Sequence, residues 1–232
     1  MPEGAVFLAR GPWGRYNDLV MVSGRKTARV SGVALAGGMS RRLGRNKAVE
    51  QVGGESLIER VVGKLSQVSS ETIVVVAEES RAEALDLPPW VRTAADIYPG
   101  SGSLGGIFTG LSAAQGDYGV VVACDMPFLN TDLLRFMVDI ASDYDVVVPK
   151  LNGRPEPLHA IYSKSCLDPI ERRLERKDLK IALLFEEVKV AYIEEEDIDS
   201  LDPTHLSFFN VNTQEDLEAA LALEAQAARG GN

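Results

Sequence analysis

Short apolar runs alternate with amphipathic stretches along most of the chain, and the apolar runs predict strands. Val33 to Ala36, Ile73 to Ala77 and Gly119 to Ala123 are apolar throughout, which is typical of parallel strands buried on both faces of a sheet. The same reasoning predicts further short strands at Trp90 to Thr93, Asp145 to Pro149, Ala160 to Tyr162, Val188 to Ile193 and Phe208 to Val211.

Helices are expected between these strands. The clearest follows Ser56, which forms a capping-box pattern with Glu59 ahead of an apolar helical face. Thr131 is expected to cap another helix, and Asn212 or Thr213 to open the last one, which ends near Leu223. The other helices are predicted at about Ser80 to Leu87, Ile107 to Ala114, Leu133 to Ile140, Ser165 to Leu174 and Leu179 to Glu186.

This alternation predicts one three-layer α/β/α domain of Rossmann-like type, with a mostly parallel sheet. We expect the domain to span residues 31–225. Residues 1–30 lack a clean period and are interpreted as an N-terminal extension that could be flexible, and residues 226–232 as a tail.

Composition narrows the class of protein. The 232 residues carry a formal net charge of −10, which argues against nucleic acid as the main partner, because nucleic-acid binders usually present a basic face. No apolar run approaches the ~20 residues that a membrane span requires. Cys124 and Cys166 have no Cys or His at metal-binding spacing, so we expect neither a zinc site nor a disulfide framework. This cysteine usage fits a reducing cytoplasm.

The residues after the first predicted strand combine paired glycines with clustered positive charge. Gly37 and Gly38 lack Cβ atoms where the chain turns, so backbone N–H groups can approach an anion closely. Four cations follow, at Arg41, Arg42, Arg45 and Lys47. In a chain of net negative charge, this local excess of cations predicts a phosphate-binding loop. A solvated basic loop is the alternative interpretation.

Two common nucleotide-binding motifs explain these glycines poorly. A Walker-type loop requires Gly-Lys-Ser/Thr, whereas two residues separate Gly44 from Lys47 and alanine follows the lysine. A second loop, Gly100-x-Gly102-x-x-Gly105, satisfies the dinucleotide fingerprint, but Pro99 and a poor strand precede it. An NAD-type oxidoreductase is therefore a minor alternative.

The first glycine loop, Asp96 and Asp125 each follow a predicted strand. In an open α/β sheet, they should converge at the carboxyl ends of the strands. Asp125 offers a hard oxygen ligand suited to Mg²⁺, which binds through one or two carboxylates and substrate phosphates, although a turn acid near Pro127 is the alternative. With Lys47 to neutralise a triphosphate, these residues predict nucleotidyl transfer by displacement at the α-phosphorus, releasing pyrophosphate.

Five motifs resemble the signature of the molybdenum cofactor guanylyltransferases, in that family's order. They are Leu35-Ala36-Gly37-Gly38-x-Ser40-x-Arg42-x-Gly44-x-x-Lys47, Gly102-Ser103-Leu104-Gly105-Gly106, Cys124-Asp125-Met126-Pro127, Glu156-Pro157-Leu158 with Tyr162, and Asn210-Val211-Asn212-Thr213-x-x-Asp216-Leu217. The first motif alone marks only the wider sugar-nucleotide-type nucleotidyltransferases, whereas the set of five is much more specific.

The resemblance implies the nucleotidyltransferase form of the α/β/α fold and an enzyme that transfers GMP from GTP to molybdopterin carrying molybdenum. The product would be the guanine dinucleotide cofactor. The resemblance also implies Mg²⁺ as cofactor, GTP and molybdopterin as substrates, and transient contact with molybdenum-insertion proteins or apo-molybdoenzymes. Neither nucleic acid nor a membrane is expected as a partner.

Residue roles follow from the resemblance, position by position. Nucleotide binding falls to Leu35, Ala36, Gly37, Gly38, Lys47, Asp96 and Asp125. Among these, Lys47 would contact the phosphates, Asp125 would bind Mg²⁺ and GTP, and both would act with Arg42 in catalysis. Asp96 corresponds to the family's guanine-reading acid, because a carboxylate can accept from both N1–H and N2–H of guanine, a pairing that cytosine cannot offer.

The acceptor side is assigned less directly. Asn210, Asn212 and Glu156 look like residues associated with the pterin end, and helix capping is the alternative role for Asn212. His159, beside Glu156, is interpreted as a structural histidine, since an acceptor phosphate needs no strong base.

Two departures and two other functions stay open. Ser103 stands where the family usually has proline, and Ala77 where some members have a nucleotide-contacting asparagine. A CTP-dependent molybdopterin cytidylyltransferase of the same fold is the nearest alternative, although Gly37 and the absence of proline before Lys47 favour GTP. A non-catalytic nucleotide-binding module is the second, against which the retention of Lys47 and Asp125 argues.

Overall fold

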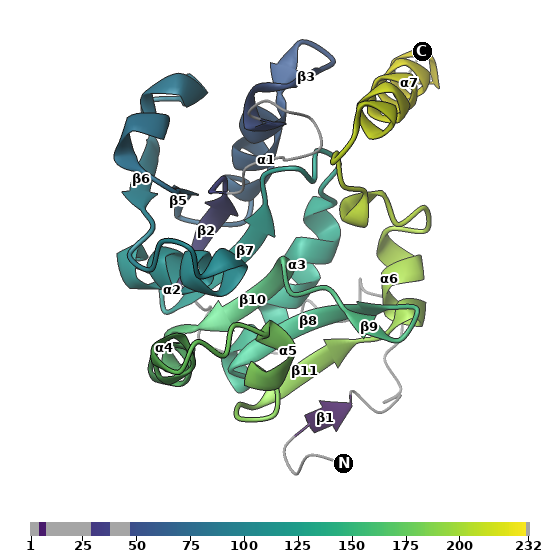
Figure 1. The fold of residues 1–232 in the computed structure, drawn as a ribbon. Coiled ribbons are helices and arrows are strands. Elements are labelled where there is room, and N and C mark those ends of the chain that lie inside the picture. Colours follow the sequence, from purple (N-terminus) through teal and green to yellow (C-terminus); the bar gives the residue numbers. More distant parts are fainter. Residues whose placement is uncertain (1–4, 8–28, 38–46, 231–232) are drawn as a thin grey trace.

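The computed structural model shows a mostly parallel β-sheet with helices on both faces (Figure 1). It describes residues 5–7, 29–37 and 47–230. The strands of this sheet are β1 (Ala5–Phe7), β2 (Val30–Leu35), β5 (Glu71–Val76), β6 (Val91–Ala95), β7 (Tyr118–Ala123), β8 (Val146–Leu151), β9 (Arg154–Pro155), β10 (His159–Ser163) and β11 (Val190–Ile193). In the described residues their order is β1-β11-β8-β10-β7-β2-β5-β6, with β9 paired to β8. β10 runs antiparallel to both of its neighbours.

Helices cover the two faces of the sheet. They are α1 (Leu57–Leu65), α2 (Gly102–Ala113), α3 (Thr131–Ile140), α4 (Leu167–Glu175), α5 (Ile181–Leu184), α6 (Glu195–Leu201) and α7 (Gln214–Gly230). One apolar core lies under α1, α3 and α6, and a second lies under α2, α4 and α5 (Figure 1). The predicted three-layer α/β/α architecture is therefore confirmed.

The carboxyl-terminal halves of the central strands β2, β5 and β7 are apolar because both of their faces are buried. In β2, Ala34 belongs to the core under α1 and α3, whereas the neighbouring Val33 belongs to the core under α2. Neither residue is exposed to solvent. The continuous apolar runs of the sequence thus have the structural cause that was expected of them.

Two helix caps test the local predictions. The capping box at Ser56 is confirmed, since its hydroxyl accepts from Glu59 N and the Glu59 carboxylate accepts from Ser56 N. The cap of α3 is Asn130 and not Thr131, because Asn130 Oδ1 accepts from the backbone N–H groups of Asp132 (2.8 Å) and Leu133 (3.1 Å). Asn130 and Thr131 are both favourable N-cap residues, and in the structure Asn130 is the one that makes the capping hydrogen bonds.

Four further differences from the predicted elements are found: two elements were wrong, one helix was missed and one helix begins earlier than predicted. Phe208 to Val211 is not a strand, since a 3₁₀ turn occupies Leu206–Phe208, and Val211 is instead buried in a small cluster with Val52, Leu57, Leu217 and Ala220. The helix expected at Ser80 to Leu87 is two 3₁₀ turns. The acidic helix α6 was not anticipated. The helix expected from Ile107 begins at Gly102 and therefore includes most of the second glycine loop.

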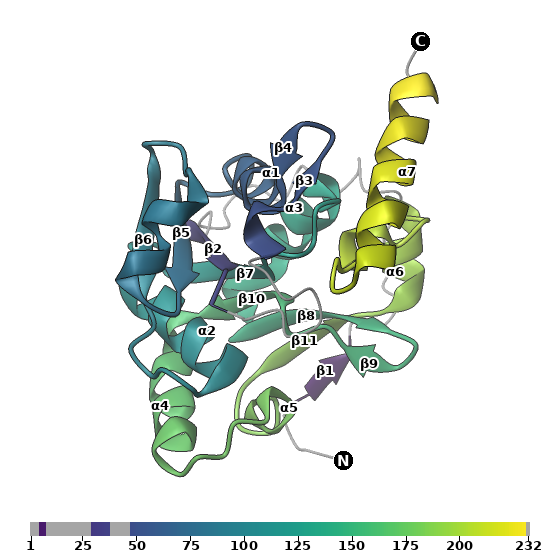
Figure 2. The ribbon, with the colours of Figure 1, turned by 45° about the horizontal axis from the view of Figure 1, so that its top comes forward.

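The termini also contribute regular structure. Part of the predicted N-terminal extension, β1, pairs in parallel with β11 at one edge of the sheet. Between the first glycine loop and α1, Gly53 and Gly54 form the turn of a small hairpin of β3 (Gln51–Val52) and β4 (Glu55–Ser56). α7 continues past its predicted end and packs beside β3, as Figure 2 shows. Within the described residues, no helix is both long and apolar enough to cross a membrane.

Candidate nucleotide-binding site

The parallel register brings the ends of β2 and β7 together at one edge of the sheet. Leu35 pairs with Ala123, and Cys124 N donates to Leu35 O at 3.1 Å, so Ala36 and Asp125 emerge side by side. On the other side of β2, Ala36 N donates to Val75 O at 2.8 Å. The backbone therefore places the start of the glycine loop beside Asp125, as predicted.

Lys47, Asp125 and Asn212 form a polar cluster at this edge. Lys47 begins a 3₁₀ turn (Lys47–Val49), and its ammonium forms a salt bridge with Asp125 Oδ2. The same ammonium donates to Asn212 Oδ1 at 3.2 Å. The backbone carbonyl of Asp125 accepts from Val211 N at 2.9 Å, which fixes the segment that carries Asn212. Three residues from distant parts of the chain therefore meet at one point.

Asp125 has the features of a cation ligand. Its side chain is almost fully buried, and its Oδ1 atom has no hydrogen-bond partner among the described residues. A buried carboxylate oxygen without a partner is costly, and a divalent cation would satisfy it. The described residues contain no cluster of three or more His, Cys, Asp or Glu side chains suited to a metal. A metal here would therefore depend on substrate oxygens and water for its other ligands, as Mg²⁺ commonly does.

Asp96 lies at the end of β6, farther along the same edge. Its backbone N–H donates to Val76 O at 2.8 Å, and its half-buried carboxylate is held by two donors. Asp96 Oδ1 accepts from Tyr98 N at 3.0 Å and from Thr109 Oγ1 at 3.1 Å. Thr109 was not predicted. Its only signal in the sequence is a hydroxyl within an apolar, glycine-rich helix.

The second glycine motif allows this arrangement. A Cβ atom at Gly105 would lie 2.9 Å from Tyr98 O and 3.3 Å from Asp96 Oδ1. The first distance is shorter than real Cβ contacts allow, so only glycine lets α2 approach the Asp96 loop this closely. Gly105, the last glycine of the motif that resembled a dinucleotide fingerprint, thus allows close packing of a helix against a carboxylate loop.

The predicted acceptor residues separate in the structure. Asn212 joins Lys47, and its alternative role as a cap is wrong, because Thr213 Oγ1 accepts from Asp216 N at 3.2 Å and opens α7. Asn210 donates to Phe208 O at 2.8 Å. Burial raises the pKa of the Glu156 carboxyl. Among the described residues, no side-chain hydrogen bond links Asn210 or Glu156 to the Lys47 cluster.

His159 is a buried, neutral ring behind this edge. Burial lowers its pKa to about 4, and its ring packs on that of Phe208 with centroids 4.7 Å apart. These features support the structural interpretation of His159. Arg42 and Gly38, which were predicted to take part in catalysis and nucleotide binding, lie outside the described residues.

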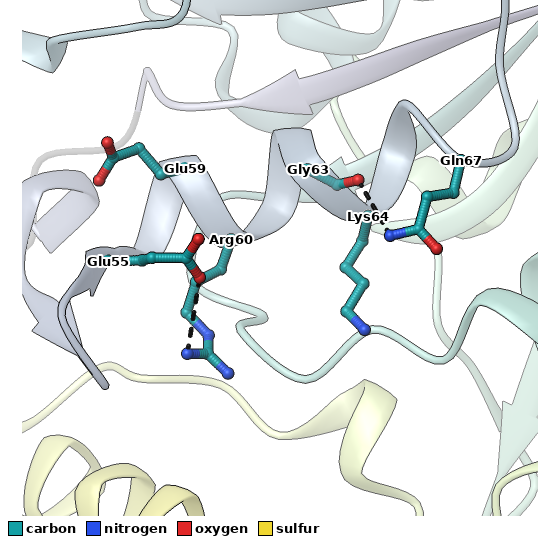
Figure 3. Close-up of a pocket in the computed structure, with 6 residues that line it drawn as sticks. All are labelled: Glu55, Glu59, Arg60, Gly63, Lys64 and Gln67. Carbon is teal, nitrogen blue, oxygen red and sulfur yellow. Dashed lines mark hydrogen bonds and ion pairs between the residues drawn. The ribbon is translucent and has the colours of Figure 1, made fainter.

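A polar groove on the outer side of α1 is separate from this site. Figure 3 shows its lining residues, among which Arg60 extends toward Glu55 and Gln67 turns back to the Gly63 carbonyl. Its remaining lining residues are Glu59 and Lys64. None of the predicted site residues lines the groove.

Several known proteins are similar to this chain in sequence and in fold. The model of the MobA-like NTP transferase domain matches residues 32–190. A probable molybdenum cofactor guanylyltransferase of Pelotomaculum thermopropionicum is 39% identical over 200 residues, covering 86% of this chain and 96% of the relative. The molybdenum cofactor guanylyltransferase of Desulfosudis oleivorans is 37% identical over 196 residues, covering 83% and 95%. The crystal structure of molybdopterin-guanine dinucleotide biosynthesis protein A from Archaeoglobus fulgidus has a TM-score of 0.75 and 32% identity, covering 84% of this chain and 99% of that one.

Proposed function

The chain belongs to the MobA-like NTP transferase family, and on that premise we propose that it transfers GMP from GTP to molybdopterin carrying molybdenum. The product is the guanine dinucleotide form of the cofactor, together with pyrophosphate. The names of the relatives support the substrates. The single structural observation that carries the proposal is the Lys47–Asp125–Asn212 cluster at the carboxyl ends of β2 and β7.

The reaction balances as one displacement. An oxygen of the terminal phosphate of molybdopterin attacks the α-phosphorus of GTP and forms a new P–O bond. The bond from the α-phosphorus to the bridging oxygen breaks, and pyrophosphate leaves with the electron pair. The Lys47 ammonium, beside Asp125, would donate hydrogen bonds to phosphate oxygens and stabilise their negative charge in the transition state.

Nucleotidyltransferases of this family generally use a divalent metal ion, and we propose Mg²⁺. The unpartnered Oδ1 of Asp125 would hold it. When bound, Mg²⁺ supplies charge neutralisation on the phosphate oxygens. Asn212 Oδ1 accepts from Lys47 and so orients the ammonium beside Asp125. Asp96 reads guanine, and Glu156 and Asn210 belong to the acceptor side, where contact with molybdenum-insertion proteins or apo-molybdoenzymes would take place.

The burial and the pKa of the two cysteines bear on the cellular compartment of the enzyme. Cys124 and Cys166 are both buried free thiols, and burial raises the pKa of each to about 12. Unreactive thiols of this kind need no oxidising compartment, which supports a cytoplasmic location.

The test is GTP-dependent conversion of molybdenum-loaded molybdopterin to the dinucleotide, with pyrophosphate release as a second readout. CTP serves as the control nucleotide. Turnover with GTP but not CTP supports the guanylyltransferase. Turnover with CTP alone would assign the chain to the cytidylyl branch, and nucleotide binding without turnover would indicate a non-catalytic module.

A further inference from the structure

We propose that Thr109 is a positioning residue that fixes the rotation of the Asp96 carboxylate, so that the site reads guanine through a single oxygen, Asp96 Oδ2. This inference rests on the proposed function, in which Asp96 contacts the base. It differs from the expectation that both carboxylate oxygens accept from guanine.

The direction of the Thr109 hydroxyl is set by the backbone. Thr109 Oγ1 accepts a hydrogen bond from Ile97 N at 3.0 Å. With that N–H on one side, the hydroxyl proton points to Asp96 Oδ1, 3.1 Å away. Thr109 is 1% exposed, so water does not compete for this proton. The single hydroxyl proton is therefore committed to Asp96 Oδ1, while one of the oxygen lone pairs accepts from Ile97 N.

The remaining capacity of Asp96 Oδ1 is taken by Tyr98. A carboxylate oxygen presents about two lone-pair sites, and Oδ1 already accepts from Thr109 Oγ1 and from Tyr98 N at 3.0 Å. Among the described residues, no hydrogen bond is made to Asp96 Oδ2. Only Oδ2 can thus accept from the N1–H and N2–H groups of guanine.

A fixed carboxylate has a consequence that a freely rotating one lacks. In Asp96→Asn, the amide oxygen must stay with the two donors from Thr109 and Tyr98, so the NH₂ group takes the place of Oδ2. A donor then opposes the donors of guanine. If the side chain could rotate freely, its oxygen would turn to guanine and preserve part of the preference for GTP.

The experiment is calorimetric binding of GTP, ATP and CTP in the presence of Mg²⁺ to the full chain. Asp96→Asn should lose the preference for GTP at least as completely as Asp96→Ala. Thr109→Val should lower the ratio of GTP to ATP affinity by about tenfold, since a hydrogen bond to a charged group is lost. Thr109→Ser, which keeps the hydroxyl, should stay within about twofold of the parent protein.

Thr72→Val is the matched control. Thr72 is also 1% exposed, and its hydroxyl has no hydrogen-bond partner among the described residues. It lies in β5, near the strand end opposite to Asp96. The nucleotide preference of this variant should equal that of the parent, and thermal unfolding of each variant shows that it is folded.

Each outcome decides between the two proposals. A preference for GTP that survives in Asp96→Asn but not in Asp96→Ala overturns the fixed carboxylate and leaves the proposed function intact. An unchanged ratio in a folded Thr109→Val does the same. A parent protein that does not prefer GTP overturns guanine reading, and with it both proposals. If Thr109→Val fails to fold, the comparison of the two Asp96 variants still decides.

Discussion

Asp125 and Asp96, the two carboxylates of the proposed nucleotide site, each commit one oxygen to the protein, but their partners differ. At Asp125, which our proposal places at the phosphate end, Oδ2 is paired with the cation Lys47, and Oδ1 is buried without a partner among the described residues. At Asp96, which our proposal places at the base end, Oδ1 is held by neutral donors from Thr109 and Tyr98. A cationic partner beside an unpartnered oxygen suits a cation ligand, whereas neutral donors orient a carboxylate for reading hydrogen bonds.

The substitution Asp125→Asn removes the negative charge that pairs with Lys47 and tests the contrast between the two carboxylates most severely. Asp125→Asn should reduce turnover with GTP by on the order of 10²–10³-fold, because the cation ligand and the partner of Lys47 are both lost. Initial rates at saturating GTP and a series of Mg²⁺ concentrations would measure the loss. The ratio of GTP to ATP affinity serves as the control and should change little. Unchanged turnover would contradict the role of Asp125.

The next largest effect concerns the stability of the scaffold behind Asp125. The pKa of His159 is lowered from its ordinary 6.5 to about 4, so the unfolded chain binds more protons between these values. The stabilising contribution is complete above about pH 6.5 and is lost as the pH falls toward 4, by roughly 3 kcal/mol at most. Urea unfolding between pH 4 and 7.5 should show this loss, and His159→Phe should reduce it. The same slope in the variant would show that other groups dominate.

Removal of the Asp96 carboxylate should have a smaller effect, and the effect should fall on nucleotide affinity and not on the rate of the reaction. Asp96→Ala should lower the preference for GTP over ATP by about 10–100-fold, since hydrogen bonds to a charged acceptor are lost. The rate at saturating GTP should change much less, because in our proposal Asp96 contacts the base and not the reacting phosphates. Separate measurement of kcat and KM tests this. A large fall in kcat with an unchanged preference would place Asp96 in the chemical step.

The smallest expected effect is that of Thr72→Val, which serves as the control for Thr109→Val. Thr72→Val replaces a buried hydroxyl that has no partner among the described residues with a methyl group of similar size. The free energy of unfolding of the Thr72→Val variant should be equal to that of the parent protein or higher by up to about 1 kcal/mol. Thr109→Val should instead lower the free energy of unfolding. Urea denaturation of both variants makes the comparison. Destabilisation by Thr72→Val would mean that its hydroxyl has a partner.

The sequence predicted the parts of the site that parallel strands position. Asp125 and the glycine loop follow fully apolar runs, so strand register alone brings them together. The Thr109–Asp96 contact could not be predicted, because nothing local distinguishes a hydroxyl in an apolar helix from a surface hydroxyl. Phe208 to Val211 was assigned as a strand because burial by helices and burial in a sheet produce the same short apolar pattern.

The Asp216 carboxylate at the start of α7 limits where an anionic acceptor can bind. Its Oδ2 accepts from the backbone N–H groups of Asn212 (2.9 Å) and Thr213 (2.8 Å). Asn212 and Thr213 immediately precede α7, so the two N–H groups next to the helix already serve a carboxylate of the chain. A phosphate approaching this corner would therefore meet the Lys47 ammonium on one side and the negative charge of Asp216 on the other.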